Sequence, residues 1–278
     1  MSAISIPVDR ILFVTYIPAA AMVLMLWDHC LTFDEEVATM WGPLDEHILT
    51  KVVHILNRYF TEAVLIYRVY VTSELAQSSG GEAHCKAVVW LANVSAVIIA
   101  SISQFYVMMR VYRLLDHRQR VRRTLVVAFG ICITAITVLS ILSVLSYLKA
   151  GAQSACAIGR IPTTVAYTIG VLLLFNVFVI FMTIYNALEK PRRSENELLD
   201  SLRRDGARIY LGICMLWLIL LVCSATIEAT SFLSLFTLVC SLNANITARV
   251  HLRIEGLRRL FPTRPVTIYR GSMENQHS

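Results

Sequence analysis

Seven stretches of mostly apolar residues, each about 20 residues long, follow one another along this chain of 278 residues. A helix of that length spans the hydrocarbon core of a bilayer. Charged residues make up only 16% of the chain, whereas soluble domains contain about 25%. We therefore expect an all-α membrane bundle with seven transmembrane helices; six spans are the alternative, because the second stretch is charged in its first half. The stretches cover residues 11–27, 48–71, 87–111, 124–148, 165–185, 207–225 and 230–250.

The basic residues predict the orientation of the chain. Most of them lie in three segments, at 110–123, 190–208 and 249–270, which share one side of the membrane if the spans alternate. Lys and Arg next to helix ends stay cytoplasmic, which puts the N-terminus outside and the C-terminus in the cytoplasm. The formal net charge of +6 then faces anionic lipid rather than nucleic acid. We expect one seven-helix domain over residues 1–250 and a cytoplasmic part over residues 251–278.

A second amphipathic pattern follows the last apolar stretch. Val250, Ile254, Leu257 and Phe261 recur at helical spacing, with arginines around them. This pattern is typical of a short basic helix lying in the membrane interface. Continuation of the seventh span is the alternative for residues 250–254. A mobile polar tail is expected after this helix, and the plasma membrane or the endoplasmic reticulum is the expected location.

Two of the seven cysteines fall on the side predicted to be outside. Cys85 begins the third apolar stretch, and Cys156 lies between the fourth and the fifth. Disulfides form in oxidising compartments, so we expect a Cys85–Cys156 bridge. The alternative is two free thiols that are too far apart to bond.

The second apolar stretch carries the strongest functional signal. His47, Lys51, His54, Arg58 and Glu62 recur at steps of four, three, four and four residues, which places them on one helical face. Ionisable groups at membrane depth normally face the bundle interior and mark a functional site. The alternative is that the first bases reach the interface, while the last two residues form a structural pair.

Acidic residues gather just before this stretch. Asp28, Asp34, Glu35 and Glu36 lie within residues 28–36, which we expect to form the first cytoplasmic loop. Their carboxylates either pair with the bases of the second stretch or belong to a solvated loop. Clustered carboxylates suit magnesium, but the spacing differs from the D-D-x-x-D motif of terpene synthases, so no metal site is expected. No nucleotide, hydrolase or zinc-protease motif is present, and no cofactor is expected.

Several polar residues lie inside the other apolar stretches. Such residues most often join helices through hydrogen bonds, and some of them line ligand pockets. Asn93 is the one we assign to ligand binding; the others are Ser95, Gln104, Asn176, Asn243 and Asn245.

Five segments of the chain resemble a family of fungal, mainly basidiomycete, membrane proteins with an N-terminal domain of unknown function. The likeness is strongest in the first ninety or so residues. It implies a seven-helix membrane protein and assigns no activity. The segments are residues 28–36, 56–59, 85–91, 110–114 and 202–206.

The predicted topology is also similar in shape to G-protein-coupled receptors, although their sequence motifs are missing. Our first hypothesis is therefore a receptor-like protein that binds a small lipophilic ligand within the bundle. Arg58, Glu62, His54 and Asn93 would hold this ligand. A cytoplasmic protein partner would bind at the basic loops, and the bilayer would surround the helices.

Two other functions remain open from the sequence. A membrane-embedded isoprenoid cyclase or isomerase needs little more than a buried carboxylic acid as proton donor, and Glu62 or Asp28 is the candidate. A transporter or scaffold without pocket chemistry is the third hypothesis.

Overall fold

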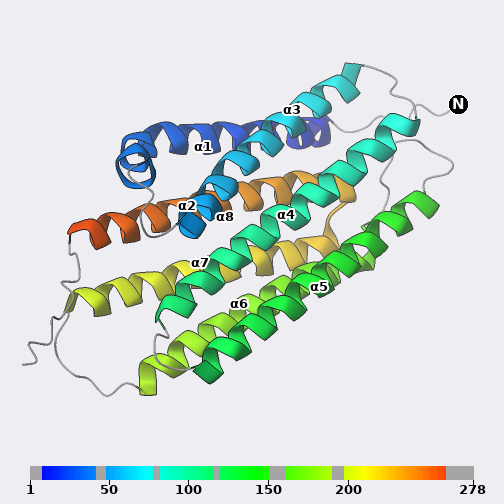
Figure 1. Ribbon diagram of the computed structural model, residues 1–278. Helices are drawn as coiled ribbons and strands as arrows, with labels where there is room; N and C mark the ends of the chain where they lie inside the picture. Colours follow the sequence, from blue (N-terminus) through cyan, green and yellow to red (C-terminus); the bar gives the residue numbers. More distant parts are fainter. Residues whose placement is uncertain are drawn as a thin grey trace, which may run out of the picture.

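The computed structural model describes residues 8–41, 48–77, 82–114, 119–150, 161–189 and 197–260. The expected all-α class is confirmed, since every regular element in these ranges is helical (Figure 1). The elements α2, η1 and α3 follow one another without a gap and form one long helix, so the chain has seven long helices in these ranges. The elements are α1 (Val8–Met40), α2 (Ile48–Ile55), the π-helical η1 (Leu56–Phe60), α3 (Thr61–Gln77), α4 (Glu82–Leu114), α5 (Gln119–Ala150), α6 (Thr163–Glu189), α7 (Glu197–Thr226) and α8 (Ala229–Leu260).

Five of the long helices are long and apolar enough to cross a membrane. Their outer faces fit that setting, because Ile131, Leu174 and Phe181 are 66%, 69% and 65% exposed, and large exposed apolar surfaces favour lipid over water. Helix α7 contributes a shorter apolar segment, Tyr210–Thr226. These helices fit a multi-pass membrane protein. The five segments are Phe13–Met40, Val89–Met109, Gln119–Ser146, Thr163–Tyr185 and Ala229–Arg253.

Consecutive long helices run in opposite directions (Figure 1). Helix α1 packs along α8 and against α3, whereas α4 contacts α5, α6 and α8. The larger core lies among α4 to α8 and includes Trp217, Leu125 and Ile136. A smaller core joins α1, α3 and α8 around Met25 and Leu65.

The alternation places the ends of α1, α4, α6 and α8 together at one end of the bundle (Figure 1). Helix α5 starts at this end with Arg120, Arg122 and Arg123, and α8 brings Arg249 and Arg253 near it. We call this the basic end. These five arginines of α5 and α8 therefore lie toward one end of the fold, as the topology predicted.

Two expectations about the ends of the apolar stretches are wrong. Residues 28–36 do not form a loop, since α1 continues to Met40. Helix α8 likewise runs without a break to Leu260, so residues 251–260 extend the last helix and no separate short helix begins after Val250. In both places the polar residues prolong a helix and do not end it.

The predicted disulfide cannot be followed in the fold. Cys156 and the side chain of Cys85 lie outside the described residues, as do Phe261 and the tail. The pairing stays a prediction. The cysteines whose side chains are described are free thiols, namely Cys30, Cys132, Cys214, Cys223 and Cys240.

Candidate functional site

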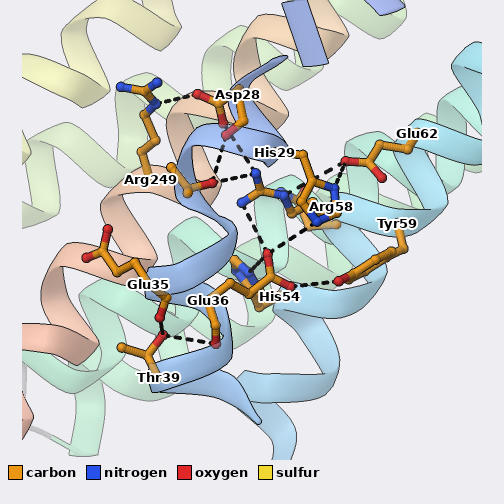
Figure 2. Close-up of polar contacts among 12 residues, drawn as sticks. Asp28, His29, Glu35, Glu36, Thr39, His54, Arg58, Tyr59, Glu62 and Arg249 are labelled. Atoms are coloured by element: carbon orange, nitrogen blue, oxygen red, sulfur yellow. Dashed lines mark hydrogen bonds and ion pairs between the residues drawn. The ribbon is translucent and has the colours of Figure 1, made fainter. Parts of the chain in front are cut away.

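Arg58 is the centre of a buried ion network near the basic end. It lies in η1 and has 0% exposure. Its Nη2 donates a hydrogen bond to the Thr32 hydroxyl at 2.6 Å. The guanidinium also faces three carboxylates, at 3.6 Å from Asp28, 3.4 Å from Glu36 and 3.9 Å from Glu62. Figure 2 shows these side chains converging on Arg58 from α1 and α3.

Two imidazoles and a phenol surround the same carboxylates. The Nδ1 atom of His29 lies 2.5 Å from Glu62 Oε1, and the imidazoles of His29 and His54 each lie 3.8 Å from Glu36. Tyr59 donates its hydroxyl hydrogen to Glu36 at 3.0 Å. Each of these contacts gives a carboxylate a partner that water would otherwise supply.

At its other edge, Arg249 of α8 donates a hydrogen bond to Asp28. With Arg58, the network thus contains two guanidinium groups and three carboxylates. Their formal charges balance when one neighbouring imidazole carries a proton. This balance matters because unpaired charge in a low-dielectric interior is costly.

Two ladders at four-residue spacing create the network. One face of α1 carries Asp28, Thr32 and Glu36. The second long helix faces it with His54, Arg58 and Glu62. Residues four apart on a helix share a face. Two neighbouring positions of α1, Leu31 and Phe33, point outward and are largely exposed. The sequence therefore builds an end of α1 whose buried face is polar.

The π-helical segment is held to two other helices through Asn57. Its amide donates to the Ala244 carbonyl of α8 at 3.3 Å and accepts a hydrogen bond from Ser103 of α4 at 3.5 Å. Thr61 donates to the Asn57 carbonyl at 2.6 Å. Short π-helical segments alter the register of a helix and often occur at functional sites. Here the segment directs Asn57 and Arg58 into the bundle.

The polar cluster continues from the network toward α4. The imidazole of His54 stacks on that of His251, with ring centres 5.0 Å apart and planes at 26°. The Nδ1 atom of His251 lies 2.9 Å from the hydroxyl of Tyr106. Buried polar contacts therefore link α1, the second long helix, α4 and α8. No group of three or more potential metal ligands is found in the described part of the chain.

A cavity of about 200 Å³ lies farther from the basic end, among α3, α4, α5, α6 and α8. Most of its lining is aliphatic or aromatic. Pockets for small ligands are typically of this kind, with a few placed polar groups. The apolar side chains include Leu65, Ile99, Ile136, Ile169, Leu172, Phe232 and Phe236.

Polar groups occupy a minority of the cavity wall. Arg68 of α3 donates to the Thr237 hydroxyl at 3.3 Å. Asn93 donates to the Ser140 carbonyl at 3.3 Å, and both of these residues line the cavity. Sequence reasoning missed Arg68. An arginine inside the apolar stretch 48–71 was the available signal, because ionisable groups at membrane depth mark functional sites.

The residues expected to bind a ligand fall into two places. Asn93 lines the cavity, while Arg58, Glu62 and His54 belong to the ion network and are not among the lining residues. Lys51 is half-buried. His47 lies outside the described residues.

Neither carboxylate expected as a general acid faces the cavity. Glu62 contacts His29 and Arg58. Asp28 contacts Arg58 and Arg249. Neither carboxylate is among the lining residues of the cavity. Neither is therefore placed to act there as the proton donor that the enzyme hypothesis requires.

Comparison with known families identifies one part of the chain. Residues 16–61 match the model of a family of unknown function (DUF6533). The chain contains a DUF6533 domain. The N-terminal domain of unknown function expected from the resemblance is thus confirmed. No curated protein and no solved structure matches the chain.

The DUF6533 domain supplies most of the ion network. Residues 16–61 include Asp28, Glu36 and Arg58, while Glu62 follows the matched segment and Arg249 comes from α8. Charged residues from the rest of the bundle therefore complete the ion network of this domain.

Proposed function

We propose that this protein is a receptor-like membrane protein that binds a small lipophilic ligand in the cavity among α3, α4, α5, α6 and α8. The observation that carries the proposal is the composition of the cavity wall: mostly apolar side chains and a few polar ones. Such a wall suits a hydrocarbon group with one polar end. The sequence assigned ligand binding to Arg58, and we now assign it to the cavity.

The same helices run through the cavity and the ion network. On the second long helix, Leu65 and Arg68 line the cavity, and Glu62 belongs to the network. On α8, Thr237 lines the cavity and Arg249 belongs to the network. A ligand that moved either helix would therefore disturb buried ion pairs near the basic end. A cytoplasmic protein partner bound at that end would respond to this change in the ion pairs.

This proposal includes seven spans, with the N-terminus outside and the basic end in the cytoplasm of the plasma membrane or endoplasmic reticulum. A glycosylation-acceptor tag on the N-terminus is expected to receive glycan in a eukaryotic host. The same tag on the C-terminus serves as the matched control and is expected to stay unmodified, because the basic segments are retained inside. Gel mobility before and after glycosidase treatment measures both. Glycan on the C-terminal tag alone would contradict the proposed orientation.

Filling the cavity is expected to remove the ligand. Ala100 is buried on α4 and lines the cavity, so Ala100→Phe places a ring where the ligand would lie. We expect at least about tenfold less lipophilic material to be retained by the purified variant, which corresponds to about 1.4 kcal/mol of binding free energy. Mass spectrometry of organic extracts from the detergent-purified protein measures the amount.

The matched control is Ala63→Phe, which adds the same ring to an exposed position of α3. It is expected to retain as much material as the original protein. Overpacking costs about 1–3 kcal/mol, so thermal unfolding is measured for each variant, and Ala96→Leu offers a smaller filling if Ala100→Phe does not fold. Equal retention by a folded cavity variant and by the control would contradict ligand binding in this cavity.

A further inference from the structure

We infer that the ligand is a lipophilic alcohol: a hydrocarbon chain whose terminal hydroxyl group is held by Ser140 and Ser143 of α5, next to Asn93 of α4. This inference rests on the proposed function and names its ligand class. It follows from the position of these polar groups in the cavity wall and from the hydrogen bonds that the wall already makes.

Hydrogen-bonding groups gather on the side of the cavity where α4, α5 and α6 meet. Asn93, Ser140, Ser143 and Thr168 all line the cavity there. The Asn93 amide donates to the Ser140 carbonyl at 3.3 Å, and the hydroxyl oxygens of Ser143 and Thr164 lie 2.7 Å apart. Ser140 and Ser143 are 6% and 3% exposed, so this polar side belongs to the interior of the bundle.

The polar side lies in the half of the cavity that is farther from the basic end. Helix α4 ends at the basic end and α5 starts there (Figure 1). On α4 Asn93 precedes Ala100, and on α5 Ser140 and Ser143 follow Ile136. The lining residues of these two helices that are nearest the basic end are therefore Ala100 and Ile136, and both are apolar. A bound amphiphile would direct its polar end away from the basic end and its chain toward it.

Most hydroxyl groups of the wall have already donated their hydrogen. A serine or threonine hydroxyl has one hydrogen to donate and two lone pairs that accept. Five lining hydroxyls donate to a backbone carbonyl of their own helix, which is a common contact for these residues. They offer a ligand acceptor oxygens only, so the ligand must supply the hydrogen. The five belong to Thr61, Ser95, Ser143, Thr168 and Thr237.

A hydroxyl group fits this wall better than a charged group. It can donate its hydrogen to Ser143 and accept one from the Asn93 amide or the Ser140 hydroxyl, whereas an ionised carboxylate cannot donate. An ammonium group would be buried without a counter-charge, because no aspartate or glutamate is among the described residues that line the cavity. Arg68 is already engaged, since it donates to Thr237 and takes part in a further interaction.

The size of the cavity favours a single chain. A volume of about 200 Å³ is below the roughly 300–1,000 Å³ of typical drug-sized pockets. A linear hydrocarbon chain fits such a space better than a fused-ring molecule. Ile136, Ile169 and Phe232 supply apolar contacts for it.

Four probes with the same chain test the polar end. Binding of oleyl alcohol, oleyl methyl ether, oleate and oleylamine is measured on the full-length protein in detergent, by competition with radiolabelled oleyl alcohol. The ether keeps the oxygen and the chain of the alcohol but has no hydrogen to donate. We expect oleyl alcohol to bind about 5- to 10-fold more tightly than the ether, which is the usual contribution of one hydrogen bond. Oleate and oleylamine are expected to bind more weakly than the alcohol.

Variants of α5 test the two serines. Ser140→Ala/Ser143→Ala removes both hydroxyls and is expected to abolish the preference for the alcohol over the ether. Ser146→Ala is the matched control: Ser146 lies on the same helix, is exposed, and donates to the Leu142 carbonyl at 2.8 Å as Ser143 does to the Leu139 carbonyl. The control should keep the full preference. Thermal unfolding confirms that each variant is folded, and Ser143→Ala alone is the smaller change if the double variant does not fold.

The outcomes separate the inference from the proposed function. Equal binding of oleyl alcohol and its methyl ether to the original protein would overturn the inference and leave a lipophilic cavity in place. Tighter binding of oleate or oleylamine than of the alcohol would overturn it as well. If none of the probes binds, both the ligand class and the proposed function fail. An alcohol preference that persists in the folded double variant would overturn the role of Ser140 and Ser143.

Discussion

Arg58→Met is expected to destabilise the folded bundle by about 3–5 kcal/mol, the usual cost of breaking a buried ion pair by removing one partner. The guanidinium is fully buried and faces Asp28, Glu36 and Glu62 within 4 Å. Methionine fills similar space but leaves these carboxylates with too little positive charge. Thermal unfolding in detergent should show a melting temperature lower by about 10 °C, since each kcal/mol shifts the midpoint by a few degrees in a chain of this size.

If unbalanced charge destabilises Arg58→Met, then removing one of the carboxylates should restore part of its stability. Glu36→Gln in the Arg58→Met background removes one of the stranded charges, so we expect the double variant to regain part of the lost stability. Contacting residues commonly couple by about 0.5–3 kcal/mol. Arg253→Met, at an exposed position of α8, is the matched control and should change stability by less than about 0.5 kcal/mol. Equal stability of Arg58→Met and this control would contradict the claim that Arg58 stabilises the folded bundle.

Trp217→Ala is expected to cost about 3–5 kcal/mol, the range for removing a large aromatic side chain from a core. Trp217 of α7 is 1% exposed and belongs to the larger core. Its ring lies 6.4 Å from that of Phe236, which lines the cavity. Alanine would leave a void beside this wall. The melting temperature is again the measurement, with an expected fall of about 10 °C.

Trp217→Phe separates packing from hydrogen bonding. The indole Nε1 of Trp217 finds no hydrogen-bond acceptor within the described part of the chain. Phenylalanine keeps an aromatic ring and removes that unpartnered N–H, so its cost should be well below that of alanine, at about 1–1.5 kcal/mol. If both variants lose the same stability, packing of the ring is not what Trp217 contributes.

The positions of the helices were largely predictable from the sequence, because apolar stretches of about 20 residues are a strong local signal. The errors occurred where a polar segment lies on a helix. Asp28 and Glu36 were expected in a loop because charged residues usually end an apolar span. They lie in α1 because their partner, Arg58, comes from another helix, and such a pairing has no signature within either segment.

The ion network was half predictable. The spacing of His54, Arg58 and Glu62 placed them on one face, and the fold brings all three into the network. Pairing with the acidic residues was one of two open alternatives, and the structure favours it. Arg249 and His251 were recognised only as part of a basic segment, although they complete the cluster from α8.

The cavity was not predictable from the sequence. Its wall combines side chains from five helices, and which helix faces meet is decided by packing across the whole bundle. Asn93 was proposed as a ligand residue from its polarity inside an apolar stretch. Arg68 is a charged residue inside an apolar stretch and is therefore a stronger indication of a site than Asn93. It was overlooked because the charged residues before it, including Arg58, are more closely spaced.

The most direct test of ligand binding in the cavity is photolabelling with oleate and oleyl alcohol analogues that carry a diazirine in the chain. After irradiation of the purified protein, peptide mass spectrometry locates the labelled residues. We predict labels on cavity-lining residues such as Ile99, Ile136 and Phe236, displaced by excess unlabelled lipid and lost in Ala100→Phe. Labels confined to outward-facing residues such as Ile131 and Leu174, with no displacement, would contradict a ligand site within the bundle.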